Sequence, residues 1–358
     1  MALDTEFIRE KSYFPRLCLL QVGNGELVAC IDPLALPDLD ELLALLYDPA
    51  VVKVFHAGRQ DLEIFYHLRG ELPQPLFDTQ IAAALLGYGD QVGYGALVKE
   101  MLGIELAKAH SRTDWSQRPL DADQLRYAAD DVRYLGDLYR EQQRMLTRLG
   151  RMDWLASDFA SLADPATYRN DARDAWRRVR GIQHLRGRQL AVLQVLAAWR
   201  EEQARMLDRP RKWILRDEVL LELARRQPLD QHALARIRGL EAAARRHYGS
   251  ELLDSIRHAR ESSPEQWPRP SRRPRLSLEQ EAAVDAMMAL VRLIAADNRI
   301  SPASLTSRKE LEQLVCGEQE CMVLRGWRGA LCGRRLQRFL KGGTGLQMVG
   351  GNLVESTP

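Results

Sequence analysis

The first 150 residues alternate β-rich and helical runs, and this alternation restricts the architectures open to the chain. A continuous apolar run at Val51–Phe55 has the composition of a buried central strand. We therefore expect an α/β layer with a mixed sheet. The other β-rich runs are Ala2–Ile8, Leu17–Val22 and Leu27–Ile31, and the helical runs are Pro37–Tyr47, Arg59–Leu68, Thr79–Leu86, Gly95–Leu102 and Asp123–Leu149.

The strand pattern fades after residue 150. Helical spacing at Gly187–Leu207, Arg216–Ala224, Gln231–Ile237 and Gly249–Arg260 predicts one compact helical bundle, and Leu276–Lys341 predicts another. Between them, residues 262–275 hold four prolines and four arginines without periodicity, which indicates a linker. We expect the Gly-rich residues 342–358 to form a disordered tail.

The small net charge of +2 hides a difference between the two parts of the chain. Residues 1–150 contain 15 basic and 23 acidic residues, whereas residues 151–358 contain 36 basic and 26 acidic residues. An acidic domain suits divalent cations, and a basic one suits a polyanion. The alternative is that the two parts merely have differently charged solvated surfaces.

Several classes of protein are disfavoured by the sequence. No run approaches the roughly 20 apolar residues of a membrane span, and no basic region followed by an apolar one marks a secretory signal. The five scattered cysteines form no CxxC pair and indicate reduced thiols. We expect a cytoplasmic protein without a membrane partner. The absence of GxxxxGK[ST] argues against a nucleotide cofactor.

Acidic residues at three places could form one site. Asp4 and Glu6 lie two apart in an expected strand, so both side chains face the same way. Asp61 follows the strand at 51–55 after Gly58 and falls in the first turn of a helix, where ligand sites of such sheets occur. Taken singly, Asp4 and Glu6 are better explained as an exposed pair, and Asp61 as a carboxylate that complements the helix dipole.

The third place is a helix with Tyr127 and Asp131 one turn apart, and Asp130 is a rival for the role of Asp131. Carboxylate oxygens are suitable ligands for two divalent metal ions, Mg²⁺ or Mn²⁺. A pair of such ions can stabilise the attacking and leaving oxygens of a phosphoryl displacement. A tyrosine beside them can hydrogen-bond the attacking water. The combination therefore predicts a two-metal phosphodiester hydrolase.

With these residues in this order, the chain resembles the DEDD superfamily of 3′→5′ exonucleases, which has a ribonuclease H-like fold. The order Asp-x-Glu, Asp and Tyr-x-x-x-Asp is that of its tyrosine-bearing branch, and within it the ribonuclease D family. The stretches that carry the resemblance are ALDTEF (2–7), HAGRQDLE (56–63), GELPQPLFDTQIAAALLG (70–87), SRTDWSQRPL (111–120) and YAADDVRYL (127–135).

The resemblance implies a role for each residue of the site. Asp4, Glu6, Asp61 and Asp131 would bind the metals, and Tyr127 would position the water. The Tyr-x-x-x-Asp spacing selects Asp131 over Asp130. The exonuclease domain would span residues 1–150. Members of the family usually carry one more strand and helix ahead of the DTEF strand, so we expect this domain to lack its first strand.

The helical part resembles HRDC domains, which are small nucleic-acid-binding modules. Residues 171–261 carry Trp199, ILRDEVLLELA (214–224), Ile237-x-Gly239-Leu240 and Tyr248-Gly249. Residues 276–341 resemble a second, diverged HRDC-like domain with ISPASLTSRKEL (300–311) and Gly326-Trp327-Arg328. The expected fold is thus a ribonuclease H-like α/β domain followed by two all-α HRDC-like domains.

The function that the resemblance implies is a monomeric exoribonuclease that trims the 3′ ends of precursor tRNA and other small structured RNAs and releases 5′-nucleotides. Two alternatives stay open. One is a 3′→5′ DNA exonuclease of the same superfamily, because no residue visibly recognises the 2′-hydroxyl. The other is a non-catalytic RNA-binding protein, if the missing strand disables the site.

Further residues are weaker candidates for contacts with the substrate, and each has a structural alternative. His56 could approach RNA, but a structurally hydrogen-bonded histidine is favoured. Asp78 is better explained as a helix cap. The predicted RNA-contacting residues are His56, Trp115, Arg118, Arg177, Arg178 and Arg186.

Overall fold

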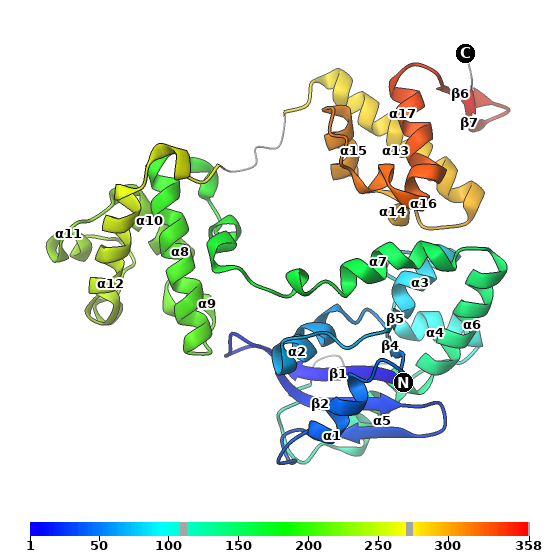
Figure 1. The fold of residues 1–358 in the computed structure, drawn as a ribbon, viewed down its shortest axis with the longest axis horizontal. Helices are drawn as coiled ribbons and strands as arrows, with labels where there is room; N and C mark the ends of the chain where they lie inside the picture. The colour runs from blue at the N-terminus through cyan, green and yellow to red at the C-terminus, as the bar shows by residue number, and fades with distance from the viewer. Residues whose placement is uncertain (108–112, 270–274, 357–358) are drawn as a thin grey trace.

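The computed structural model describes residues 1–107, 113–269 and 275–356. A five-stranded mixed sheet forms the centre of the first domain, with strand order β3-β2-β1-β4-β5 (Figure 1). β1 pairs antiparallel with β2 and parallel with β4, so the expectation of a mixed sheet is confirmed. The strands are β1 (Ala2–Ile8), β2 (Arg16–Gly23), β3 (Val28–Ile31), β4 (Lys53–Phe55) and β5 (Leu76–Asp78).

Helices cover both faces of this sheet. On one face, α1 and α2 pack apolar side chains against Leu3, Leu20 and Phe55. On the other face, α5 contacts β1, β2 and β3. The helices in the described part of this domain are α1 (Asp40–Leu46), α2 (Arg59–Arg69), α3 (Thr79–Leu86), α4 (Tyr94–Leu102), α5 (Ala122–Arg133) and α6 (Leu135–Arg148).

The single helical run expected at 123–149 is two helices in the structure. Tyr134 separates α5 from α6 with φ −104° and ψ 1°. The hydroxyl of Tyr94 accepts a hydrogen bond from the Tyr134 amide at 3.1 Å and donates one to the Asp130 carbonyl at 2.9 Å. A tertiary contact from α4 thus replaces helical hydrogen bonds at this point, which local periodicity cannot reveal.

Two groups of helices follow the first domain. The first lies around the long helix α8 and the second around α13, on separate sides of Figure 1. The first group comprises α8 (Arg188–Met206), α9 (Arg211–Ile214), α10 (Asp217–Arg226), α11 (Gln231–Ala235) and α12 (Ala242–Glu261), and the second comprises α13 (Leu278–Asn298), α14 (Pro302–Leu305), α15 (Arg308–Val315), α16 (Gly326–Arg328) and α17 (Arg334–Leu340). No helix in the described part of the chain is both long and apolar enough to cross a membrane.

The first helical group is anchored to the first domain through the turn between β1 and β2. Tyr13 in this turn is 4% exposed, and its ring belongs to the apolar core around α8. Its hydroxyl donates to Glu201 at 2.5 Å, and the amides of Tyr13 and Phe14 both donate to Asp208 at 3.0 Å. The strand that carries Asp4 and Glu6 therefore leads directly into a contact with the helical domain.

The second helical group is anchored through α7 (Leu155–Leu162) and the residue before it. Trp327 stacks on Trp154 with ring centroids 4.3 Å apart, and its indole nitrogen donates to the Trp154 carbonyl. Arg328 is 6% exposed and donates to both carboxylate oxygens of Asp158 at 2.8 Å. Buried contacts thus fix both helical groups to the first domain.

The expected disordered tail is wrong for the described residues of this segment. β6 (Gly345–Val349) and β7 (Asn352–Ser356) form an antiparallel hairpin. The connecting Gly350 and Gly351 have φ of +56° and +81°, which suits a two-residue hairpin turn. Arg335 of α17 pairs with Glu355 and holds the hairpin to the domain. The glycine content does not indicate disorder here, because Gly350 and Gly351 form the turn of the hairpin.

The segment expected as a linker is partly packed. Pro264–Gln266 form a short 3₁₀ turn, and the Arg188 guanidinium lies 5.9 Å from the centre of the Trp267 ring. Residues 270–274 of the expected linker lie outside the described residues.

Candidate metal centre and active site

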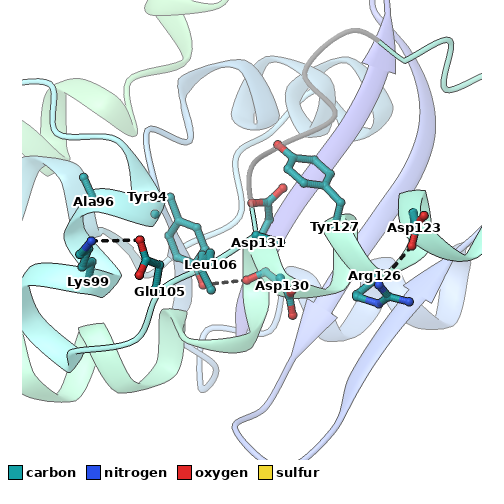
Figure 2. A pocket seen from close by; sticks show the side chains of 12 residues that line it. Tyr94, Ala96, Lys99, Glu105, Leu106, Asp123, Arg126, Tyr127, Asp130 and Asp131 are labelled. Carbon is teal, nitrogen blue, oxygen red and sulfur yellow. Dashed lines mark hydrogen bonds and ion pairs between the residues drawn. The ribbon is translucent and has the colours of Figure 1, made fainter.

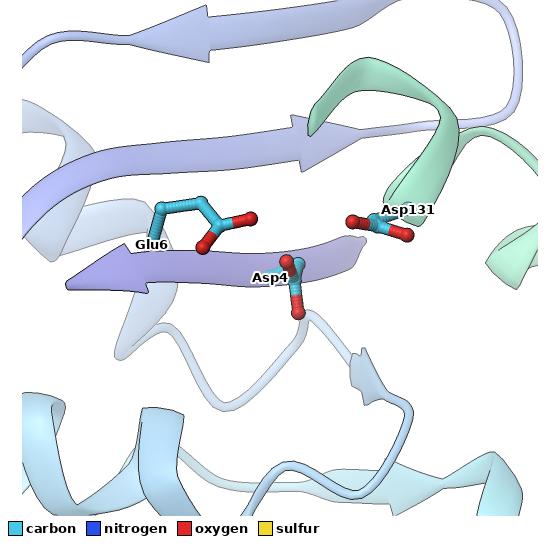
Figure 3. A group of neighbouring side chains, drawn as sticks. All are labelled: Asp4, Glu6 and Asp131. Carbon is cyan, nitrogen blue, oxygen red and sulfur yellow. The ribbon is translucent and has the colours of Figure 1, made fainter. Parts of the chain in front are cut away.

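Asp4, Glu6 and Asp131 bring their carboxylates together (Figure 3). Asp4 and Glu6 lie on β1, and Asp131 lies on α5, which crosses the same face of the sheet. One carboxylate oxygen from each lies within 4.8 Å of those of the other two. This is the pattern of oxygen ligands that a hard divalent cation requires. Asp4 and Glu6 point to the same face of β1, as their spacing predicts, and Asp131 of α5 faces them.

Asp61 lies outside the three-carboxylate cluster found among the described residues, on the side of β1 to which Thr5 points. It lies in the first turn of α2 and is 7% exposed. Its carboxylate accepts a hydrogen bond from the hydroxyl of Thr5, the residue between Asp4 and Glu6. Thr5 thus ties α2 to the strand that carries the other carboxylates. Thr5 was not among the predicted site residues, although its place between the two acidic residues was a usable signal.

The turn before α2 is tightly built. A Cβ at Gly58 would lie 2.5 Å from the Cβ of Phe55, so a larger residue has no space there. Asp78 accepts hydrogen bonds from the amides of Ala57 and Gly58 as well as from Gln80 and Ile81 of α3. Asp78 is therefore the cap that was predicted, and it also fixes the turn that positions Asp61.

The carboxylates of the cluster oppose one another's ionisation. Burial, followed by the charges of Asp61, Asp131 and Glu6, raises the pKa of Asp4 well above its usual value. Burial and the charges of Asp131 and Asp61 raise the pKa of Glu6 to about 8. Burial is also the main cause that raises the pKa of Asp131 to about 7 and that of Asp61 to about 6. A bound cation would relieve this repulsion, so the donor set fits divalent metal.

Tyr127 lies one turn before Asp131 on α5, and Figure 2 shows both side chains at the same pocket. Burial, the Asp131 and Glu6 charges and a hydrogen bond to Asp131 raise the pKa of the Tyr127 hydroxyl, which therefore stays protonated. The ring lies over Trp115 with centroids 6.2 Å apart and an interplanar angle of 28°. Trp115 is 6% exposed and thus supports Tyr127 from the protein interior.

Asp130 has a different role from Asp131. Its carboxylate pairs with Arg133 at 2.8 Å, and its carbonyl accepts from Tyr94. It is absent from the three-carboxylate cluster of the described residues. The choice of Asp131 over Asp130 agrees with this geometry.

A pocket of about 520 Å³ opens beside Tyr127 and Asp131. It is lined on one side by α4 and on the other by α5 (Figure 2). Lys99 and Arg126 contribute basic groups to its wall, and Leu106 contributes an apolar one. These three residues could not be predicted from the sequence. Lys99 and Arg126 have the pattern of an ordinary helix surface, and Leu106 that of an ordinary loop.

Comparisons with known proteins identify the family. The model of the 3'-5' exonuclease family matches residues 1–147, and that of the HRDC domain matches residues 189–256. Ribonuclease D of Acidiphilium cryptum is 42% identical over 361 aligned residues, which cover 99% of this chain and 91% of that protein. The chain belongs to the ribonuclease D family. Ribonuclease D of Pseudomonas paraeruginosa is 41% identical, with 95% and 92% of the two chains covered.

A solved structure supports the same assignment. The crystal structure of Escherichia coli RNase D matches with a TM-score of 0.79 at 35% identity, over 95% of this chain and 92% of that one. The chain is accordingly a ribonuclease D-type 3′→5′ exoribonuclease, with a ribonuclease H-like domain followed by a helical HRDC region.

The weaker site candidates of this ribonuclease D-family chain already have partners within the protein. His56 uses both ring nitrogens, to the Thr79 hydroxyl and the Val92 carbonyl, each at 2.9 Å. Arg118 pairs with Asp32 through two nitrogens and also donates to the Cys18 and Trp115 carbonyls. These contacts agree with the structural alternative for each.

The three arginines predicted to contact RNA lie before α8. Arg177 pairs with Asp174 and stays about half exposed, at 52% of its side-chain surface. Arg178 is 3.9 Å from the buried carboxylate of Glu201. Arg186 donates to two main-chain carbonyls.

Proposed function

We propose that this chain trims the 3′ ends of small structured RNAs, precursor tRNA among them, at the cluster of Asp4, Glu6 and Asp131. The observation that carries the proposal is the meeting of these three carboxylates, with Tyr127 one helical turn from Asp131. Together with Asp61, they would hold two divalent ions, Mg²⁺ or Mn²⁺. Such ions, when bound, stabilise charge on the phosphoryl oxygens and lower the pKa of a bound water.

Residues of the chain position the reactants. The Tyr127 hydroxyl would hold the attacking water, while Trp115 keeps the phenol ring in place. The water oxygen forms a bond to phosphorus, and the bond from phosphorus to the 3′ oxygen of the preceding nucleotide breaks. That oxygen leaves as the new 3′-hydroxyl after taking up a proton. The product released is a 5′-nucleotide.

The body of the RNA would lie against the helical domains. Residues 151–358 hold 36 basic and 26 acidic residues, and basic groups close to phosphates release condensed counterions. We assign phosphate contacts to Arg177, Arg178 and Arg186, whose segment leads into α8. We assign to His56, Trp115 and Arg118 the support of the loops around the pocket. Residues 276–341 would act as a second HRDC-like domain.

The substrate class can be tested with a tRNA that carries a few extra 3′ nucleotides. We expect stepwise shortening that slows when the paired acceptor stem is reached, and much slower shortening of a DNA strand with the sequence of the extension. Faster removal of deoxynucleotides would favour a DNA exonuclease. Tight binding of the tRNA without shortening would indicate a non-catalytic RNA-binding protein.

A further inference from the structure

Gln21 is fully buried, and its side chain lacks any hydrogen bond among the described residues. The residue lies on β2 with 0% of its surface exposed. Neither its amide nitrogen nor its amide oxygen has a partner. A buried amide without partners costs free energy, and such a group in a native protein usually has a water, an ion or a functional partner.

The sheet register places Gln21 beside the carboxylate cluster. Asp4 is its direct partner across β1 and β2, so the two side chains share one face of the sheet. On its other side the register partner is Cys30, whose thiol is directed to the Leu125 carbonyl of α5. Of these two lateral neighbours, Asp4 offers the strong hydrogen-bond acceptor.

Helix α5 closes the space above Gln21. A Cβ on Gly23, two residues along β2 on the same face, would lie 3.3 Å from the Val132 carbonyl. Ala128 and Val132 of α5 are buried against this face, at 0% and 1% exposure. Helix α5 therefore covers the face of the sheet on which Gln21 and Asp4 lie side by side.

We propose that Gln21 is a positioning residue of the metal centre, whose amide hydrogen-bonds to the Asp4 carboxylate through one buried water. This inference rests on the proposed function, because it needs Asp4 to be a metal ligand. Partners of ligating carboxylates orient them and tune metal affinity. Gln21 does not touch the substrate and acts through Asp4.

The test is the binding of Mn²⁺ without RNA, measured by calorimetry on the full chain with Gln21→Met. Methionine keeps the length of the side chain and removes both polar atoms of the amide, and the melting temperature in chelator checks separately that the variant folds. We expect Mn²⁺ affinity to fall about tenfold or more. A purely structural amide would leave it unchanged.

Gln142 offers a matched control. It is also 0% exposed and has an orphaned amide oxygen, but its nitrogen donates to the Thr79 carbonyl at 2.9 Å. Gln142→Met should lower the melting temperature, because it removes that buried hydrogen bond, and should leave Mn²⁺ affinity unchanged. If Gln21→Met fails to fold, the test uses Gln21→Asn, which moves the amide back by one methylene. The same fall in Mn²⁺ affinity is then expected.

The outcomes separate this inference from the proposed function. Weaker Mn²⁺ binding in the Gln21 variant but not in the Gln142 variant supports the inference. Wild-type affinity in the Gln21 variant overturns it while leaving the metal centre intact. If the wild-type protein itself binds no Mn²⁺, both the metal centre and the role of Gln21 fail.

Discussion

Asp131→Asn should lower exonuclease turnover by roughly 10³-fold, the scale of losing preorganised charge stabilisation in an active site. Asp131 is one of the three carboxylates that converge within 4.8 Å, and asparagine has the same shape without the charge. The hydrogen-bonding hydroxyl of Tyr127 also loses its charged partner. The measurement is the single-turnover rate on an unstructured RNA at saturating Mg²⁺.

The neighbouring Asp130 provides the control. Asp130→Asn removes one carboxylate from the same helix, but this group pairs with Arg133 at an exposed site. Such a surface pair contributes about 0.3–0.5 kcal/mol. We therefore expect the turnover of Asp130→Asn to stay within about threefold of wild-type turnover. Equal losses in both variants would show that the assignment of Asp131 is mistaken.

Tyr127→Phe should lower turnover by about 10²-fold, the contribution that a positioned proton-handling group commonly makes. The phenyl ring retains its position over Trp115, so the pocket wall keeps its shape. The change removes only the hydroxyl beside Asp131. We therefore expect kcat to fall while Mn²⁺ affinity stays near the wild-type value.

Tyr139→Phe is the control, because it makes the same chemical change on α6. The Tyr139 ring packs edge-on against Phe77, with ring centroids 4.8 Å apart. This variant should keep wild-type kcat. Unchanged turnover in Tyr127→Phe would rule out a role for its hydroxyl, whereas a fall in both variants would point to a general effect on the fold.

Much of the site follows from periodicity. A strand places Asp4 and Glu6 on one face, and a helix places Tyr127 and Asp131 one turn apart. These local relations hold in the structure. Taken one at a time, the acidic residues were better explained as an exposed pair and a helix-dipole carboxylate. Their combination indicated one metal site, and the resemblance to a family assigned a role to each residue.

Features that depend on tertiary contacts could not be predicted from the sequence. β5 has three residues, too few to show a period of two. The break at Tyr134 depends on the Tyr94 hydroxyl of another helix. The role of Trp115 was open between stacking on RNA and packing, and its burial beneath Tyr127 decides for packing.

The unpaired side-chain amide of Gln21 could not be predicted from the sequence either. Its sequence context is an ordinary apolar strand, and only the register with Asp4 and the cover of α5 reveal where it lies. The anchoring of Tyr13 in the helical domain joins residues 188 positions apart, which no local pattern indicates.

The central claim is that the carboxylate cluster hydrolyses RNA from its 3′ end with the help of divalent metal. The direct measurement follows a 5′-labelled RNA through a time course with the full chain and Mg²⁺. We predict labelled products that become shorter one nucleotide at a time, arrest by chelator and recovery when Mg²⁺ is restored. Early release of a labelled 5′ nucleotide, labelled fragments from internal cleavage, or shortening that continues in chelator would contradict the account.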